Sequence, residues 1–122
     1  MSRLTGFDHV RLAMPPRREA DAVAFYEGVL GLPRIPTPAA LAGRGRWWFG
    51  DGTVEIHLAE EEGFEAARQA YPALAVADLH ALTADLRAAG IEVTDGPVLD
   101  GVERAVVEDP FGNRLELVAR AD

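Results

Sequence analysis

Three side chains of metal-binding types stand in strand-like segments that alternate polar and apolar residues. The segments are FDHVRLA (residues 7–13), TVEIHLA (53–59) and RLELVA (114–119), which carry His9, His57 and Glu116, respectively. Successive side chains of a strand point to opposite faces, so each of the three lies opposite the apolar residues of its segment. Two imidazoles and one carboxylate form a common ligand set for Fe, Mn, Ni, Co or Zn, with open positions left for a substrate. If the strands belong to one curved sheet, these residues predict a divalent-metal site in its hollow.

The competing interpretation is that these residues are ordinary strand residues. An isolated strand histidine is more often a surface or core-edge residue than a ligand, and the chain has no contiguous metal motif such as HExxH. The remaining histidine, His80, falls in a predicted helix and is expected to face solvent. Spacing alone leaves both interpretations open.

Two arginines accompany the candidate ligands. Arg11 shares a predicted face with His9, and Arg114 shares one with Glu116. A guanidinium binds a carboxylate or phosphate through two parallel hydrogen bonds, so both arginines are candidate substrate-binding residues. The alternative is an ion pair across the cleft with Glu55 or Glu116.

Adjacent aromatic residues and one further carboxylate complete the candidate site. Trp47 and Trp48 are neighbours, so the pleat sends one ring to each face of the sheet. One ring is expected in the core, and the other is a candidate wall for a flat or apolar ligand. Glu55 lies two residues before His57 and is either a general base or a solvated rim residue.

The elements that must position these residues follow a β-α-β-β-β order that occurs twice. In the first copy a strand at 7–13, a helix at 17–30 and strands at 46–49 and 53–59 are located, and one strand after the helix is not. The second has a strand at 73–77, a helix at 79–89 and strands at 91–94, 102–107 and 114–119. Gly31 and Gly90 follow the two helices, and Asp78 is a predicted N-cap. The pattern predicts an α+β fold with half-buried, mostly antiparallel strands in a single domain (1–122), with modules at about 5–60 and 71–119.

Composition narrows the classes of function. The chain has 122 residues, of which 48% are hydrophobic and 26% charged, as is usual for one globular domain. The net charge of -8 repels phosphate backbones, so nucleic-acid binding is not expected. No apolar run reaches the ~18 residues of a membrane span, and no signal-peptide pattern opens the chain, so no membrane association and a cytoplasmic location are expected. The absence of cysteine excludes disulfides and thiolate ligands.

Five segments together resemble the vicinal oxygen chelate superfamily. They are DHVRLA, FYEGVLGLP, EIHL, YPALAVADLHAL and EDPFGNRLEL, in this order over about residues 5–119. The superfamily includes glyoxalase I, extradiol dioxygenases, fosfomycin-resistance enzymes and bleomycin-binding proteins. The resemblance implies two βαβββ modules that form a curved, mostly antiparallel sheet around a cleft. It also implies that His9, His57 and Glu116 take the first, second and fourth metal-ligand positions.

The third ligand position departs from the family pattern. The family places a histidine at the start of the second module, where this chain has Tyr71 in YPALAVADL. A phenol is protonated at neutral pH and binds divalent metals poorly, so Tyr71 is expected to contact the substrate or a metal-bound water. Glyoxalase I carries a carboxylate at the second position, where this chain has His57. The resemblance therefore argues against glutathione-dependent glyoxalase I, and the missing third histidine argues against fosfomycin transferase and extradiol dioxygenase activities.

Two functions of different classes follow. The first is a metal-dependent lyase, isomerase, transferase or dioxygenase that chelates a small substrate through neighbouring oxygens. Its candidate catalytic residues are Glu116, Glu55 and Tyr71. The alternative is a metal-free, bleomycin-type binding protein that sequesters a cationic antibiotic in an acidic, aromatic groove. For either function the resemblance implies a homodimer and a small-molecule ligand.

Overall fold

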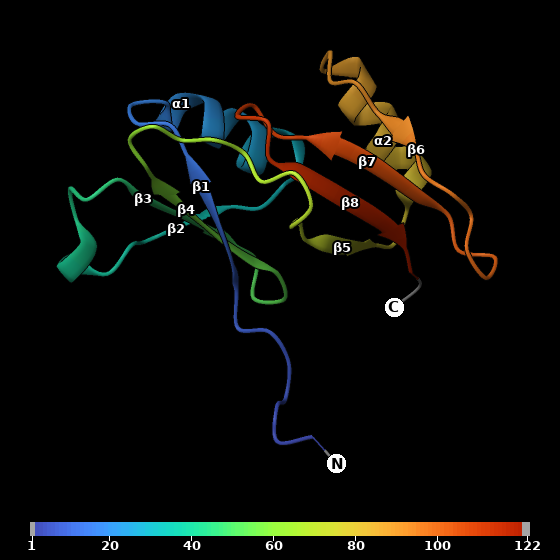
Figure 1. Cartoon of the computed structure of the whole chain (residues 1–122), viewed down its shortest axis with the longest axis horizontal. Helices are drawn as coiled ribbons and strands as arrows, with labels where there is room; N and C mark the ends of the chain where they lie inside the picture. Colours follow the sequence, from blue (N-terminus) through green and yellow to red (C-terminus); the bar gives the residue numbers. More distant parts are fainter. Residues whose placement is uncertain (1, 121–122) are drawn as a thin grey trace. The chain divides into compact units, whose positions relative to one another are not determined.

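The computed structural model describes residues 2–120 of the chain, in two compact units, Met1–Phe64 and Glu65–Asp122. Each unit contains one four-stranded sheet and the helical segments that belong to it (Figure 1). Both units follow the β-α-β-β-β order, so the predicted α+β fold with two βαβββ modules is confirmed.

Unit 1 consists of β1 (Val10–Met14), α1 (Glu19–Ala22), the π-helix η1 (Val23–Val29), β2 (Arg34–Ile35), the 3-10 helix η2 (Ala39–Leu41), β3 (Arg46–Gly50) and β4 (Glu55–Glu60). Its strand order is β1-β4-β3-β2, with β1 parallel to β4 and the other pairs antiparallel. The helix predicted at 17–30 is one α-helical turn that continues as a π-helix. The amide of Leu30 bonds the carbonyl of Phe25, five residues back, and Gly31 then leaves the helix with a φ of +77°.

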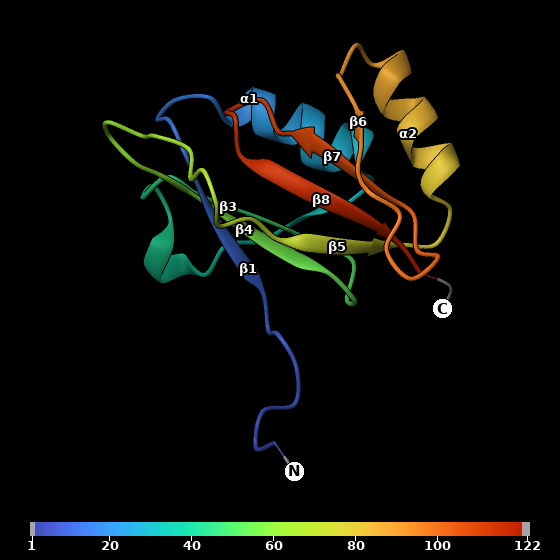
Figure 2. The same cartoon turned by 45° about the vertical axis from the view of Figure 1, so that its right-hand side comes forward.

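Unit 2 repeats the plan with β5 (Ala73–Val76), α2 (Leu79–Ala88), β6 (Thr94–Asp95), β7 (Arg104–Glu108) and β8 (Arg114–Ala119), as Figure 2 shows. The order is β5-β8-β7-β6, with β5 parallel to β8. Asp78 caps α2 by accepting a hydrogen bond from the amide of Ala81 at 3.0 Å, as predicted. The strands predicted at 91–94 and 102–107 lie slightly later in the chain, at β6 and β7.

Each sheet buries one face. In unit 1 the fully buried side chains include Met14, Tyr26, Phe49, Ile56 and Leu58. In unit 2 they include Leu86, Val107, Leu115 and Leu117. Every second residue of β4 and β8 points into these cores, so the residues between them face away from the cores. That second face carries the candidate site residues.

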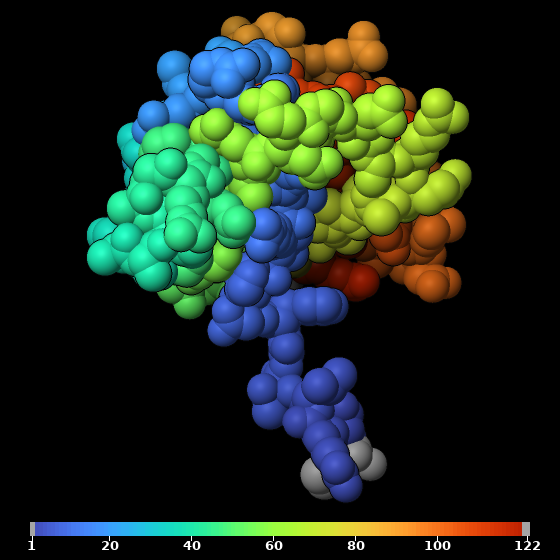
Figure 3. Space-filling model, turned by 60° about the vertical axis from the view of Figure 1, so that its left-hand side comes forward, coloured from blue at the N-terminus to red at the C-terminus, as the bar shows by residue number. Residues whose placement is uncertain are grey.

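The first strand begins later than the alternation predicts. Phe7 to His9 precede β1, and the Phe7 side chain is 97% exposed. The partner strand β4 starts only at Glu55, after a turn at Asp51, and sheet pairing begins with Val10 opposite Ile56. The segment before β1 extends away from the rest of unit 1 (Figure 3). Within residues 2–120, no helix has the length and apolar character of a membrane span.

Candidate functional site

His57 occupies the middle of the sheet of unit 1. On β4 it lies opposite Arg11 of the parallel strand β1 and opposite Trp48 of the antiparallel strand β3. Residues directly opposite each other in a sheet point to the same face, so these three side chains form one row. A tight turn sets this register, because the Asp51 carboxylate accepts hydrogen bonds from the amides of Thr53 and Val54 at 2.9 and 2.8 Å. Those two bonds lower the pKa of Asp51 below its ordinary value of 3.8.

Three flat rings stack at this point. The Trp48 and His57 ring centroids are 3.7 Å apart with planes 4° from parallel, and those of His57 and His9 are 3.9 Å apart at 18°. The His57 side chain is therefore only 8% exposed. Because both of its faces are covered, His57 can act chemically only through the nitrogens at its ring edge.

A carboxylate holds one nitrogen of each imidazole. Nε2 of His57 donates to Oε2 of Glu55 at 2.5 Å, and Nδ1 of His9 donates to Oδ1 of Asp8 at 2.8 Å. In each neutral ring the lone pair is then on the other nitrogen, Nδ1 of His57 and Nε2 of His9. Metal-ligating histidines in proteins are usually oriented by such a second bond to a carboxylate, so this donor set fits a divalent ion in its chemistry.

The free lone pairs of the two imidazoles do not yet point to one common position. A nitrogen lone pair lies in the plane of its ring, and the two stacked planes are close to parallel. One ring must tilt before both lone pairs can meet a single ion. In agreement, no group of three or more His, Cys, Asp or Glu side chains within the described part of the chain is placed to hold a metal ion.

A hollow of about 270 Å³ opens beside the stack. It is lined by residues of unit 1 alone, among them His9, Arg11, Arg46, Trp48, Glu55 and His57. Arg46 was missed by the sequence reasoning. The signal that could have found it is its position two residues before Trp48, which places it on the same face of β3.

Trp47 points to the opposite face of β3. Its Nε1 donates to Oε2 of Glu60 at 2.8 Å, and the guanidinium of Arg34 lies 5.5 Å from its ring centre. The pleat therefore places the two indoles on opposite faces of β3, with Trp48 at the hollow and Trp47 away from it. Glu60 is the last residue of β4, and its Oε1 also accepts a hydrogen bond from the amide of Arg17.

Glu116 lies in the middle of β8 in unit 2, opposite Ala73 of β5 and Val106 of β7. Its Oε1 accepts a hydrogen bond from Nη1 of Arg104 at 2.6 Å, and the two side chains are 17% and 22% exposed, respectively. The Nε of Arg104 is buried and has no hydrogen-bond partner among the described residues. The arginine that pairs with Glu116 was not anticipated from the sequence.

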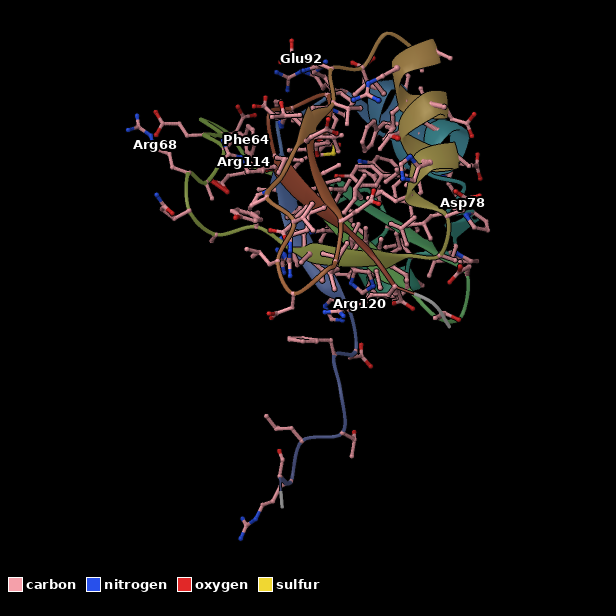
Figure 4. The ribbon with its side chains drawn as sticks, turned by 90° about the vertical axis from the view of Figure 1, so that its right-hand side faces the viewer. Phe64, Arg68, Asp78, Glu92, Arg114 and Arg120 are labelled. Carbon is pink, nitrogen blue, oxygen red and sulfur yellow. The ribbon has the colours of Figure 1, made fainter. Side chains whose placement is uncertain are left out.

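Arg114 and Tyr71 form a second contact in unit 2. The guanidinium of Arg114, labelled in Figure 4, lies 5.8 Å from the centre of the Tyr71 ring, which is a cation–π distance. The amide of Glu116 bonds the carbonyl of Pro72 at 3.0 Å, and this bond holds the chain next to Tyr71 against β8. Tyr71 is 38% exposed and available to a ligand.

The family model described as the Glyoxalase/Bleomycin resistance protein/Dioxygenase superfamily matches residues 6–117. The chain belongs to this superfamily. A protein from Bacillus anthracis, described as a member of the glyoxalase family, has a crystal structure that shares 39% identity with this chain over 98% of both chains, with a TM-score of 0.92. No curated protein matches the chain.

More distant solved structures share the fold. The fosfomycin resistance protein FosX from Listeria monocytogenes is 16% identical over 97% of this chain and 95% of its own, with a TM-score of 0.75. A point mutant of FosX, solved with Mn(II) and 1S,2S-dihydroxypropylphosphonic acid, is 16% identical over 95% and 92%, with a TM-score of 0.77. A fosfomycin resistance protein of this fold thus binds a divalent metal together with a small molecule.

Proposed function

We propose that the chain is a divalent-metal-dependent enzyme that acts on a small substrate through two neighbouring oxygens. Membership of the superfamily supports this proposal. So does the FosX complex, in which Mn(II) accompanies a molecule with hydroxyls on adjacent carbons. The observation that carries the proposal is the pair of imidazoles, each oriented by its own carboxylate, beside a hollow of small-molecule size. Isomerase, lyase, transferase and dioxygenase reactions stay open.

The proposed ligands are His9, His57 and Glu116, with Fe, Mn, Ni, Co or Zn as the ion. When bound, such an ion supplies Lewis-acid or redox chemistry. Arg104 engages Oε1 of Glu116 at 2.6 Å, so Oε2 is the oxygen that would bind an ion. The carboxylate bonds of the two histidines likewise leave one nitrogen of each ring available.

The other site residues bind, orient or move protons. Glu55 holds the Nε2 proton of His57, and so it fixes the tautomer that offers Nδ1; it is also the candidate general base. Trp48 walls the hollow and keeps water from one side of His57. In unit 2, Tyr71 and Arg114 are proposed to contact the substrate. A homodimer and a cytoplasmic location complete the proposal, and light scattering at micromolar concentration tests the dimer.

Elemental analysis of the purified, tag-free protein tests the proposal. The wild type, reconstituted separately with Fe, Mn, Ni, Co and Zn, is compared with His9→Ala, Glu116→Ala and the control His80→Ala, whose ring is exposed on α2. We expect near-stoichiometric metal in the wild type and the control, and loss in the other two variants. Retention of metal by both His9→Ala and Glu116→Ala contradicts the proposed ligand set.

Replacement of Glu55 tests whether its hydrogen bond to His57 supports metal binding at the same site. Loss of an outer-shell partner typically lowers metal affinity by about 10- to 100-fold, so Glu55→Gln is expected to weaken metal binding by that factor. Glu61→Gln, a change of equal charge at an exposed position after β4, is the matched control. Equal metal affinity in the two variants shows that Glu55 does not orient His57.

A metal-free binding protein is the second candidate. The near-parallel imidazoles and the net charge of -8 favour it. Quenching of tryptophan fluorescence by a cationic glycopeptide antibiotic, in the presence of EDTA, tests this function. Quenching with a micromolar or lower dissociation constant supports sequestration. Fluorescence that does not change during the titration contradicts it.

A further inference from the structure

The positive charges at the hollow in unit 1 come from two arginines. Arg11 and Arg46 both line it, and neither guanidinium has an ion pair or hydrogen bond with any other residue that the structure describes. The two carboxylates that line the same hollow, Asp8 and Glu55, bond imidazoles instead. In a chain with 20 acidic and 12 basic residues, unpaired cations in a concave site are an unexpected feature.

The sheet register places the two arginines diagonally across the central strand β4. Arg11 on β1 lies opposite His57, and Arg46 on β3 lies opposite Ala59, two residues further along the central strand β4. From the usual strand spacing and rise, their Cα atoms are about 12 Å apart, so two long side chains can both reach a small molecule between them. The methyl group of Ala59 leaves room there, and Trp48 provides a flat apolar wall.

We infer that this hollow is an oxyanion subsite and that the substrate carries a carboxylate, phosphonate or phosphate group. The planar guanidinium fork matches these groups in geometry and charge. About 270 Å³ is at the small end of ligand pockets, which suits an organic acid of a few carbons. The inference deepens the proposed function and rests on it, because only an enzyme has a substrate. It assigns Arg46 as a specificity-determining residue. Two unpaired guanidiniums also repel a cationic ligand at this hollow.

Calorimetric titration of the EDTA-treated, full-length protein tests the subsite without metal. The probes are methylphosphonate and lactate, with propane-1,2-diol as the neutral match. Loss of a hydrogen bond to a charged group costs about 1.5–3 kcal/mol, so Arg11→Gln and Arg46→Gln are each expected to weaken anion binding by about 10- to 100-fold. Arg44→Gln changes the same charge at an exposed position outside the lining and is expected to bind as the wild type does.

Two further measurements guard against a misfolded variant and a general charge effect. Arg46→Lys keeps the charge but loses the fork, so its affinity is expected to lie between those of the wild type and Arg46→Gln. Added salt is expected to weaken binding of both anions to the wild type and to leave the diol unchanged.

The outcomes separate this inference from the proposed metal dependence. Anion binding that depends on Arg11 and Arg46 supports the subsite even if no metal is taken up, in which case the metal proposal fails alone. Metal uptake that depends on His9, with equal anion affinity in all three glutamine variants, overturns the subsite alone. Absence of anion binding in both the metal-free and the metal-loaded protein also overturns it.

Discussion

Replacement of Arg104 by methionine tests the ion pair that holds Glu116. The substitution removes the guanidinium but keeps an unbranched apolar stem in a position that is four-fifths buried. Loss of one partner of a buried pair costs about 3–5 kcal/mol. The same change removes the buried Nε that has no partner, which returns about 1 kcal/mol. With a further reduction for the partial exposure of Glu116, we expect Arg104→Met to lower the free energy of unfolding by about 2 kcal/mol.

The decisive comparison is a double-mutant cycle. Glu116→Leu alone leaves Arg104 unpaired and is expected to cost about 3 kcal/mol, whereas Arg104→Met/Glu116→Leu is expected to lie within about 1 kcal/mol of the wild type. Urea denaturation measures all four proteins, and a loss of 2 kcal/mol corresponds to a fall in Tm of roughly 6–8 °C for a chain of this size. The control Arg114→Met, on the exposed part of the same face, is expected to cost less than about 1 kcal/mol. Additive single effects would refute the reasoning, because they would show that the two side chains do not stabilise each other.

Three further predictions concern the turns that place the strands and the start of α2. Because the pKa of Asp51 is lowered in the folded state, its contribution to stability is present above pH 3.8 and is lost as the pH falls through the lower, folded value. In chemical denaturation, Asp51→Asn should therefore be less stable than the wild type at pH 7, and this difference should shrink below pH 3.8. Gly45→Ala is expected to cost more than about 1 kcal/mol, since the residue has a φ of +68° and a Cβ there would lie 2.8 Å from that of Glu60. Gly43→Ala, with a φ of +74° and nothing within 4 Å, is its control, and equal losses of unfolding free energy would show that the Glu60 contact is unimportant. Asp78→Ala should cost about 1 kcal/mol in urea denaturation, because it removes the hydrogen bond that caps α2; no change would mean that the cap contributes nothing.

Local patterns in the sequence determine most of the fold. Alternation on β4 and β8 divides buried residues such as Ile56 and Leu117 from the face that carries His57 and Glu116. Helix signals mark the ends of the helical segments, and Gly31 takes the positive φ that its position predicts. These features depend only on neighbours in the chain, so a sequence contains them in full.

Lateral neighbours were decided by the tertiary structure alone. Alternation determines the face to which a side chain points, whereas the register of strand pairing determines which residue stands beside it. Register brings Trp48 against His57, and it pairs Glu116 with Arg104. It also leaves Arg46 at the hollow without a partner among the described residues. The local sequence places Arg46 on the same face as Trp48, but it does not show which side chains stand beside it.

The start of β1 shows the same division. The alternation from Phe7 to Ala13 is a valid strand pattern, yet the strand begins at Val10, and in this register Phe7 and Asp8 would stand opposite residues that precede β4. A strand needs hydrogen-bond partners from a distant part of the chain, and a local pattern cannot say where these end. The sequence by itself thus determined most of the order of elements and the faces of His57 and Glu116. The tertiary structure decided the contacts between them, since long-range pairing, not local preference, sets which side chains meet.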